Sequence, residues 1–475
     1  MSPLVPIAVC CLGYLAIVLV VGAAAYKRTS NDPEDYFLGG RSAKTLVLFF
    51  ALFGTNVTPF VLLGIPGLAY HEGVGVFGYN AAIVALGIPL TFWLIGRPAW
   101  HAARRHGAIT PAELYAKQLN SPAVGVVLFV AFTAYTLPYL VTSVVGVGIA
   151  VETFTGGAVS GVLAAAGILV ATVVYTAAGG MRATMWTNVV QGAWFMVFIL
   201  VAFFAIADGL GGAAAATGAV QDQAPELLVV TGHPRFASAS WASWGLAISL
   251  TVIAFPHMLV RVFAAKDQAV LRQTCRAYPV ALLVLWLPVV LVGVWGAAAL
   301  PGLEGRASDR ILPLMVAKFM SPWWQGLGLA AILAAVMSTL DAQFLTLSSM
   351  LGRDVLRRAY PALTPAREVG WGRVFAVVLA LVTFVVVLAA PASIFAIATF
   401  AFSGYVMLVP TLYLGLVWPR FGARAAIASI VLGNVVLVAA FAIGTPEGGV
   451  QPVAYGLAAA IVAGLVFAQR KEAPR

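Results

Sequence analysis

Long apolar segments separated by short polar ones run along the whole chain and predict a bundle of membrane-spanning helices. A helix needs about 20 predominantly apolar residues to cross a bilayer. Thirteen segments come close to this length, at residues 4–26, 44–70, 73–96, 122–151, 157–178, 186–207, 239–263, 277–300, 321–350, 371–391, 394–418, 423–443 and 450–468. The predicted fold class is an all-α polytopic membrane protein with about 13 transmembrane helices, in which residues 1–475 form one transmembrane domain.

The positive charges predict how these helices are oriented. Lysine and arginine are enriched in cytoplasmic loops of membrane proteins. If the N-terminus lies outside, the loops that become cytoplasmic contain all but four of the 27 basic residues. The four that remain outside are Arg235, Arg306, Arg310 and Lys318. We therefore expect an outside N-terminus and a cytoplasmic C-terminus, in a cell membrane that we take to be a bacterial inner membrane.

Composition excludes several other classes of protein. The chain is 62% hydrophobic and 9% charged, whereas a soluble domain is about half apolar and about a quarter charged. The net charge of +10 belongs mainly to the predicted cytoplasmic loops, so no nucleic-acid partner is expected. No metal cluster, phosphate-binding loop or nucleophile–base set typical of an enzyme is evident. The expected partners are the lipid bilayer and a small-molecule substrate, and a monomer is compatible with the sequence.

Two of the apolar segments are poor continuous helices, with proline at membrane depth beside polar residues. The first has Pro59 and Pro66 within GTNVTPFVLLGIPG, and the second has Pro256 within SLTVIAFPHMLVR. Proline removes a backbone donor and clashes with the preceding turn, and carbonyls freed in this way need polar partners inside a membrane. Interrupted helices in matching positions of two halves indicate a transporter site built on inverted repeats. The alternative is that both are ordinary proline kinks.

The positions of these two segments predict how the chain is divided. They are the second and the seventh of the thirteen, so the second interruption comes five spans after the first. We expect five-helix repeats at 44–207 and 239–418, in which the interrupted helices are the first and the sixth of the core. One extra helix at 4–26 precedes this five-plus-five inverted repeat, and two C-terminal helices follow at 423–468.

Five stretches of the chain resemble the sodium:solute symporter family in order and spacing. They are EDYFLGGRS at 34–42, GIPGLAY at 64–70, YTAAGGMRATMWTNVVQG at 175–192, FPHMLVRVFAAKD at 255–267 and AAVMSTLDAQFL at 334–345. The resemblance implies the leucine-transporter fold and Na⁺-driven transport. FPHMLVR, STLDAQ and WPRFGARAAIASIVLGN are most similar to the pantothenate and monocarboxylate permeases, which implies a carboxylate substrate.

Two other solute classes fit this resemblance less well. Proline permeases have aromatic residues on the turn before the Pro-His pair, where this chain has Ile248 and Val252. Sugar carriers have polar residues after the first break, where this chain has Phe60 and Val61. Sugar hydroxyls would find too few partners at these positions.

Adjacent hydroxyls suggest where the coupling ion binds. Ser338 and Thr339 lie deep in an apolar segment, and hydroxyl oxygens together with carbonyls of an unwound helix suit Na⁺. The resemblance implies that these hydroxyls bind Na⁺ together with the backbone carbonyls of Gly54, Val57 and Ala335. Alternatively, both hydroxyls bond to carbonyls one turn earlier in their own helix. Many relatives have an aspartate at the position of Asn188, where some bind a second sodium, so we expect one coupling ion here.

Other polar residues near the spans have alternative roles. Asp341 follows Ser338 by three residues, so it lies on roughly the same helix face, and an acidic residue inside a span indicates function. It could tune cation affinity or relay a proton, or it could pair with Arg353 near the cytoplasmic end. His257 and Arg261 are four residues apart and suggest an inner gate or a contact with lipid headgroups, although a substrate role is also open.

The substrate is expected near the middle of the membrane, between the two breaks. The residues expected to line its site are Asn56, Thr58 and Phe60 at the first break, Thr251, Phe255 and Pro256 at the second, Tyr79 and Asn80 where the resemblance to sugar carriers places polar residues, and Ser403 and Gly404 from the tenth core helix. Helix N-termini at the breaks favour an anionic group. No buried arginine or lysine is evident, so amides and hydroxyls are expected to bind such an anion.

The sequence therefore predicts a secondary active transporter in which inward Na⁺ flow drives the uptake of a small organic solute by alternating access. The solute is expected to be a carboxylate. Two alternatives remain open, a solute-sensing membrane domain and a proton-coupled symporter for an amino acid or another small solute. Proton coupling stays open because Asp341 is present and Asn188 replaces an acid.

Overall fold

The computed structural model describes residues 4–26, 32–389 and 393–468, and every named element in this part of the chain is helical. Its helices of ten or more residues are α1 (Leu4–Tyr26), α3 (Thr45–Asn56), α7 (Arg97–His106), α9 (Pro122–Phe154), α10 (Gly161–Gly209), α11 (Ala213–Gln223), α12 (Ser238–Ala254), α14 (Gln268–Ala299), α16 (Pro322–Met350), α18 (Pro365–Ala389), α19 (Ile394–Val406), α21 (Ala423–Ile443) and α22 (Pro452–Val466). The shorter α-helices are α2 (Pro33–Leu38), α4 (Ile65–Glu72), α5 (Gly75–Phe77), α6 (Ile83–Thr91), α8 (Pro111–Gln118), α13 (Pro256–Phe263), α15 (Ile311–Phe319), α17 (Arg357–Ala359) and α20 (Val409–Val417).

Tighter or wider helical turns connect several of these helices. Turns with 3₁₀ geometry are η1 (Gly39–Arg41), η5 (Pro225–Leu228), η6 (Pro234–Phe236) and η7 (Gly305–Arg310). Turns with π geometry are η2 (Phe60–Gly64), η3 (Gly78–Ala82), η4 (Phe92–Gly96) and η8 (Leu351–Leu356). Single π-helical turns within α-helices are frequent at functional sites, and η2 directly follows the first predicted break.

The all-α membrane fold is confirmed. Within the described residues, nine helices are long and apolar enough to cross a membrane, or eleven if each of two bent pairs is one span. Gly161–Val174 and Pro452–Val466 are apolar but shorter, so the count of thirteen stays a prediction. The bent pairs are Thr45–Asn56 with Phe60–Glu72 and Ser238–Ala254 with Pro256–Phe263, each bent by 54°. These are the two helices that the sequence predicts to be interrupted.

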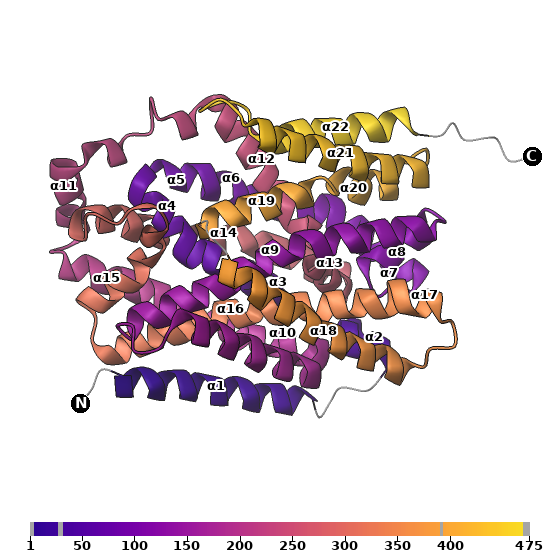
Figure 1. Ribbon diagram of the computed structural model, residues 1–475, viewed down its shortest axis with the longest axis horizontal. Helices are drawn as coiled ribbons and strands as arrows, with labels where there is room; N and C mark the ends of the chain where they lie inside the picture. Colours follow the sequence, from indigo (N-terminus) through magenta and orange to yellow (C-terminus); the bar gives the residue numbers. More distant parts are fainter. Residues whose placement is uncertain (1–3, 27–31, 390–392, 469–475) are drawn as a thin grey trace, which may run out of the picture.

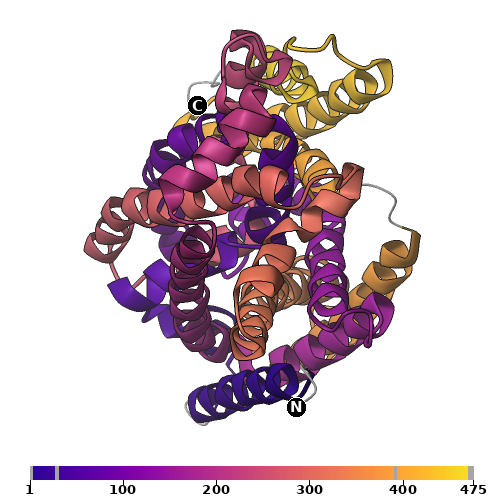
Figure 2. The same ribbon diagram turned by 90° about the vertical axis from the view of Figure 1, so that its left-hand side faces the viewer.

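The helices lie roughly along one direction, with short connecting helices at both ends of the bundle (Figure 1). The N-terminal α1 lies at one edge against α10 and α16, and the pair α21 and α22 lies at the opposite edge, as the end-on view also shows (Figure 2). In the most apolar stretch of 18 residues in the span that contains α16, 94% of the residues are buried. The corresponding share is 22% for α1 and 28% for α21. The centre of the core is therefore α16, which carries Ser338 and Thr339.

Two expected segments, 157–178 and 186–207, are joined in α10 by a bend at Gly180. The φ of Gly180 is +60° and its ψ is −169°, a conformation that glycine adopts easily because it has no Cβ. A Cβ at this position would also lie 2.9 Å from the ring of Tyr36. A glycine therefore lets the chain reverse where α2 packs closely against it.

Proline alone does not interrupt a helix in this protein. Pro138 lies inside α9, and Pro279 and Pro288 lie inside α14, yet both helices continue past them. At the two breaks, by contrast, the residues before the proline leave the helical conformation. Val57 has φ −86° and ψ 105°, and Phe255 has φ −65° and ψ 126°. The interpretation of these two sites as ordinary kinks is therefore wrong.

Candidate cation and substrate sites

The first break frees backbone carbonyls at the end of α3. Pro59 has no N–H group, so the carbonyl of Thr55, four residues earlier, loses its helical donor. Thr58 lies outside the helix, and its carbonyl accepts a hydrogen bond from the N–H of Val61 (2.9 Å). The carbonyls of Gly54 and Thr55 are therefore available to a neighbouring helix.

That neighbouring helix is α16, which offers two adjacent hydroxyls. Ser338 Oγ donates a hydrogen bond to the Gly54 carbonyl at 3.0 Å, and Thr339 Oγ1 donates one to the Thr55 carbonyl at 3.1 Å. Both hydroxyls also lie near the Ala335 carbonyl, at 2.8 and 3.0 Å. Five oxygen atoms of buried residues thus meet at the break. Neutral oxygens of this kind suit an Na⁺ ion, for which freed carbonyls and hydroxyls are typical ligands.

The structure brings together four of the five residues expected at the cation site. Gly54, Ala335, Ser338 and Thr339 meet as described, whereas no hydrogen bond joins Val57 to either hydroxyl within the described residues. Val57 is fully buried in the linker between α3 and Pro59. The Thr55 carbonyl was not predicted, although a proline four residues later is a sequence signal for it. Each hydroxyl bonds to the Ala335 carbonyl of its own helix, as one of the two expectations has it, and also reaches a carbonyl of α3. Binding of Na⁺ by these hydroxyls stays a prediction.

A buried charged pair lies one turn further along α16. Asp341 and Arg261 are both fully buried, and Asp341 Oδ1 lies 3.9 Å from Arg261 Nη2. The expectation that no buried arginine is available is therefore wrong, as is the interpretation of Arg261 as a headgroup contact. The reason is that α13 begins at a break inside the bundle, so its first turns stay buried. Arg353 does not pair with Asp341 but lies 3.0 Å from Glu113 and 3.6 Å from Glu368.

The second break is formed by one extended residue. Phe255 leaves the helix and Pro256 begins α13. Thr251 Oγ1 donates to the Phe402 carbonyl at 3.1 Å, which ties α12 to α19 just before the break. His257 is fully buried and stacks on Phe255, with ring centroids 5.2 Å apart. A contact of His257 with lipid headgroups is therefore also wrong.

Aromatic rings fill the space between the two breaks. Phe402 of α19 lies edge-on to Phe60, with centroids 5.0 Å apart, and 5.6 Å from Phe255. Tyr139 of α9 stacks on Phe255 at 5.0 Å and meets Phe402 at 5.3 Å. Phe395 stacks on Phe60 at 5.5 Å. The sequence prediction included Phe60 and Phe255 but missed Phe395, Phe402 and Tyr139, because aromatic residues in spans are too common to mark a site.

The other residues predicted at the first break lie next to this aromatic group. Asn56 is the last residue of α3 and is partly buried. Thr58 is fully buried, and its hydroxyl accepts a hydrogen bond from the N–H of Phe60 at 3.1 Å. This bond orients the first turn after the break and therefore the ring of Phe60.

Tyr79 and Asn80 contact α12 on the N-terminal side of the second break. Trp244 Nε1 donates to Asn80 Oδ1 at 2.9 Å, and the Trp244 ring stacks on Tyr79 with centroids 5.9 Å apart. The Tyr79 hydroxyl lies 3.5 Å from Ser240 Oγ. Trp244 in turn lies 5.8 Å from Phe395. Tyr79 and Asn80 therefore connect to the aromatic group through Trp244.

Ser403 and Gly404 have local roles in the packing of α19. Ser403 Oγ donates to the Thr399 carbonyl of its own helix at 2.7 Å. A Cβ on Gly404 would overlap the ring of Tyr135 on α9. Gly404 thus permits the close approach of α19 and α9.

A cavity of about 710 Å³ opens at the end of the bundle that carries α4, η7 and α15. Its lining includes Gly64, Phe395 and Thr399, and the charged side chains of Glu72, Arg235 and Asp309. Arg235 pairs with Glu72 at 3.1 Å and lies 5.9 Å from the centre of the Phe395 ring. Since Phe395 stacks on Phe60, one aromatic pair separates this cavity from the first break.

Asp309 connects η7 to the start of α19 beside this cavity. Its carboxylate accepts a hydrogen bond from the N–H of Ile394 at 3.0 Å. Burial raises the pKa of Asp309 to about 6, although this hydrogen bond and the charge of Arg306 act in the opposite direction.

The opposite end of the bundle is closed between the two interrupted helices. The N–H of Ala43, just before α3, donates to the Ala264 carbonyl at 3.1 Å, and the N–H of Lys266 donates to the Ala43 carbonyl at 2.9 Å. Trp100 Nε1 and Arg104 Nη2 each donate to the Ala265 carbonyl at 3.0 Å. A route from the breaks to this end is therefore blocked by backbone and side-chain hydrogen bonds.

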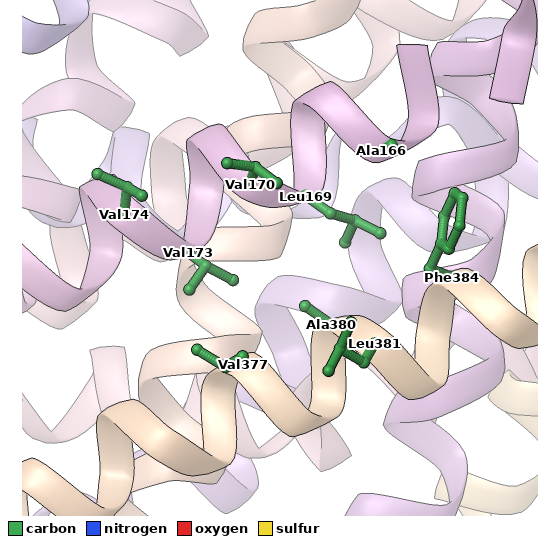
Figure 3. Close-up of a pocket in the computed structure, with 9 residues that line it drawn as sticks. All are labelled: Ala166, Leu169, Val170, Val173, Val174, Val377, Ala380, Leu381 and Phe384. Carbon is green, nitrogen blue, oxygen red and sulfur yellow. The ribbon is translucent and has the colours of Figure 1, made fainter. Parts of the chain in front are cut away.

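A second cavity, of about 440 Å³, lies between the first half of α10 and α18 (Figure 3). Its lining consists of Ala166, Leu169, Val170, Val173, Val174, Val377, Ala380, Leu381 and Phe384. All of these side chains are hydrocarbon, so the groove offers nothing to bind an ion or a carboxylate. We therefore assign no transport role to it.

Comparisons with known proteins show the family of this chain. The sodium:solute symporter family matches residues 36–433. The sodium/pantothenate symporter of Escherichia coli (strain K12) is 28% identical over 472 residues, covering 96% of this chain and 94% of that protein. The sodium/proline symporter of Salmonella typhimurium is 25% identical over 445 residues, covering 90% of this chain and 86% of that protein.

Solved structures share the fold. A substrate-bound, outward-open Na⁺-coupled sialic acid symporter has a TM-score of 0.80 and 18% identity, covering 97% of both chains. MhsT in complex with L-phenylalanine has a TM-score of 0.56 and 11% identity, covering 90% of this chain and 98% of that one. The family and these relatives are transporters, which confirms the expected leucine-transporter fold, the coupling to Na⁺ and the absence of enzymatic function. The chain thus belongs to the sodium:solute symporter family and is a multi-pass, Na⁺-coupled carrier of a small solute.

Proposed function

We propose that this carrier couples the inward flow of one Na⁺ to the uptake of a small organic carboxylate, of the monocarboxylate or pantothenate type, by alternating access. The observation that carries the proposal is the meeting of the Ser338 and Thr339 hydroxyls with the carbonyls of Gly54 and Thr55 at the first break. We assign the Na⁺ to oxygen ligands of Gly54, Val57, Ala335, Ser338 and Thr339, with the Thr55 carbonyl beside them.

Binding of Na⁺ at this point would connect two separate elements. The carbonyls belong to α3 and the hydroxyls to α16, and each hydroxyl lies within hydrogen-bond distance of one of those carbonyls. When Na⁺ binds, each hydroxyl can rotate so that its oxygen faces the ion. The ion then replaces weak neutral hydrogen bonds by stronger ion–oxygen contacts between α3 and α16, and so favours one arrangement of the two helices.

The residues between the breaks suit a substrate with one polar end and an apolar body. Phe60, Phe255 and Phe402 offer apolar contact, and the N-terminus of α13 at Pro256 offers positive backbone dipoles to an anion. The Escherichia coli relative is named a sodium/pantothenate symporter, and pantothenate is a solute of this kind, with a carboxylate end. A sodium/proline symporter is also similar to this chain. However, this chain has Ile248 at a position where proline permeases have an aromatic residue.

The membrane orientation and the repeats are part of the proposal. With the N-terminus outside and the C-terminus cytoplasmic, the 710 Å³ cavity faces outside and the closed end faces the cytoplasm. Each of the repeats, 44–207 and 239–418, then begins with one interrupted helix. An outside-facing cavity above a closed inner end is the arrangement in which a carrier accepts its solute from outside.

The proposal is tested with purified protein in proteoliposomes under an inward Na⁺ gradient. Labelled pantothenate, pyruvate, lactate and proline are offered separately, with K⁺ replacing Na⁺ in parallel. We expect Na⁺-dependent uptake of one of the three carboxylates other than proline. Na⁺-dependent uptake of proline alone would refute the proposed solute class.

The cation site is tested with Ser338→Ala/Thr339→Ala. This pair should abolish Na⁺-dependent uptake and the rise in melting temperature that Na⁺ causes by binding the folded state. The matched control is Ser349→Ala on the same helix, because Ser349 Oγ is buried and donates to the Thr346 carbonyl of α16. Na⁺-driven uptake that survives the double substitution would exclude these hydroxyls as ligands.

A further inference from the structure

The second cavity, of about 440 Å³, is a groove on the outer surface of the bundle between the first half of α10 and α18. We call it the α10–α18 groove. Val170 and Val174 on its α10 wall are each 65% exposed, and Leu381 on its α18 wall is 61% exposed. Exposed apolar side chains of a membrane-spanning bundle contact lipid tails. The groove therefore faces the hydrocarbon of the membrane.

The α18 wall of the groove is a single face of that helix. Its residues follow one another at intervals of three and four, the spacing that places side chains on one side of a helix. They are Val377, Ala380, Leu381 and Phe384. Arg373 lies four residues before the first of them, and therefore on the same side. Along α18 the groove thus leads from hydrocarbon side chains to an arginine.

The two walls are suited to a hydrocarbon occupant. Leu169 and Val173 of α10 face Val377 and Ala380 of α18 across the groove (Figure 3). Burial of apolar surface is favourable and needs no particular geometry of hydrogen bonds. The volume also falls in the range of about 300–1,000 Å³ that is typical of sites for small molecules. An acyl chain matches both the chemistry and the size of the groove.

Together with Arg373, the groove has the length of one lipid leaflet. Phe384 is 11 residues after Arg373, which corresponds to about 16 Å along the helix axis. The hydrocarbon core of a bilayer is about 30 Å thick, so one leaflet contributes about 15 Å. A single acyl chain can therefore lie in the groove with its headgroup at Arg373 and its end near the middle of the membrane.

The arginine end of the groove has the features of a membrane surface. Trp371 is 52% exposed two residues before Arg373, and tryptophan and arginine are typical of the ends of spans. A narrow recess lined by Thr176, Arg373 and the α2 residue Tyr36 continues the groove at this end. Since α2 directly precedes Ala43, this is the closed end of the bundle.

Arg373 is available to an anion at this surface. Its side chain is exposed, and among the described residues no carboxylate forms an ion pair with it. Arg182, at the same end of α10, is by contrast paired with Asp35. A guanidinium matches the oxygens of a phosphate group with two parallel hydrogen bonds, and basic residues at the membrane surface attract anionic lipids.

We propose that the α10–α18 groove binds one acyl chain of an anionic phospholipid, and that Arg373 binds the phosphate of the same molecule. The lipid comes from the leaflet at the closed end of the bundle, which is the cytoplasmic leaflet in the proposed orientation. Its chain fills the space between α10 and α18 and so connects one helix of each predicted repeat. Lipid binding here depends neither on the solute nor on the proposed Na⁺ site.

The test uses the full-length carrier in vesicles of phosphatidylcholine that contain a small fraction of phosphatidylglycerol with a photoreactive diazirine in the middle of one acyl chain. After irradiation, peptide mass spectrometry identifies the labelled residues. A parallel sample contains phosphatidylcholine with the same diazirine. We expect phosphatidylglycerol to label the groove residues of α10 and α18 about fivefold more than phosphatidylcholine does, because one basic residue at the membrane surface favours an anionic lipid by about this factor.

Two variants separate the contribution of the headgroup from that of the chain. Arg373→Gln should lower labelling of the groove by phosphatidylglycerol to the level of phosphatidylcholine. Ala380→Phe places a ring in the groove and should lower labelling by both lipids. The matched controls are Arg367→Gln, an exposed arginine at the start of the same helix, and Ala439→Phe, an exposed alanine of α21. Both controls should be labelled like the wild type.

Several results would overturn the inference, and the first two need no variant to fold. One is equal labelling of the wild-type groove by the two lipids. Another is a groove labelled no more than the exposed face of α21, whether a second copy of the carrier covers it or lipids pass over it without binding. The third is unchanged labelling by phosphatidylglycerol in Arg373→Gln, which would exclude this guanidinium as the partner of the phosphate.

Discussion

Replacing Pro59 by alanine should disrupt the proposed Na⁺ site, because α3 could then continue as a helix through the break. Pro59 provides no N–H, which leaves the Thr55 carbonyl free to accept the Thr339 hydroxyl at 3.1 Å. An alanine at this position supplies that N–H, so α3 can continue through the linker. The carbonyl would then be used within its own helix and turned away from α16.

The size of this effect follows from the helix propensity of the two residues. Alanine is favoured over proline inside a helix by about 3 kcal/mol, a figure that already includes the regained backbone hydrogen bond. A shift of roughly 3 kcal/mol toward the continuous helix corresponds to a factor of about one hundred to two hundred. The residues around the break oppose part of it, including the bond from the Phe60 N–H to the Thr58 hydroxyl. We therefore expect the Na⁺ concentration for half-maximal binding to rise at least tenfold.

The assay is ²²Na⁺ binding combined with thermal unfolding in Na⁺ and in K⁺. Pro59→Ala should be at least as stable as wild type in K⁺ and should lose most of the stabilisation by Na⁺. Pro288→Ala is the control, because Pro288 lies inside the unbroken α14 and gains an N–H without closing a break. If Pro59→Ala binds Na⁺ with wild-type affinity, the freed carbonyl is not what forms the site.

Three further predictions concern stability. Burial raises the pKa of Asp309 to about 6, so stability should fall as its carboxyl ionises between about pH 4 and pH 6, and Asp309→Asn should flatten this fall in melting curves. Burial alone would raise the pKa of Glu113, but hydrogen bonds from Arg353 outweigh it and lower that pKa to about 2. The stability that Glu113 contributes should therefore be present above about pH 4.5 and decline toward pH 2, and melting curves of Glu113→Gln should lack this decline. Gly404→Ala should lower the free energy of unfolding by about 1–3 kcal/mol, because its Cβ would overlap the Tyr135 ring, and unchanged denaturation curves would contradict this packing.

The sequence predicts the fold well where one physical signal dominates. Apolar length defines most of the spans, and both predicted interruptions are present as 54° bends. Short helices such as α8 and α15 were not predicted, because each is only eight or nine residues long and lies within a loop. The join of two segments in α10 was also missed, since a glycine bend at Gly180 is not distinguishable in sequence from a loop.

The site is predicted less completely, because it depends on contacts between distant segments. Ser338 and Thr339 were identified from their own helix. Pro59 is a sequence signal for a free carbonyl at Thr55, but the contact of that carbonyl with Thr339 depends on the geometry of the break. Arg261 looks like a loop residue in the sequence, since a positive charge usually marks the end of a span. Its burial results from a helix that begins in the middle of the bundle, and the pairing of Arg261 with Asp341 cannot be derived from either segment alone.

The two interrupted helices meet α16 through neighbouring contacts, which indicates how ion binding controls movement. At the closed end, the pairing of Ala43 with Ala264 and Lys266 joins the start of α3 to the end of α13, so these two helices are expected to move together. One contact of this joined pair with α16 is at Ser338 and Thr339, where Na⁺ is proposed to bind. The other is at Asp341, through Arg261. Both contacts lie within four residues of one helix, so the Na⁺ and the guanidinium act on the same interface. Release of Na⁺ leaves the two neutral hydrogen bonds of Ser338 and Thr339 and the 3.9 Å charge contact to resist separation.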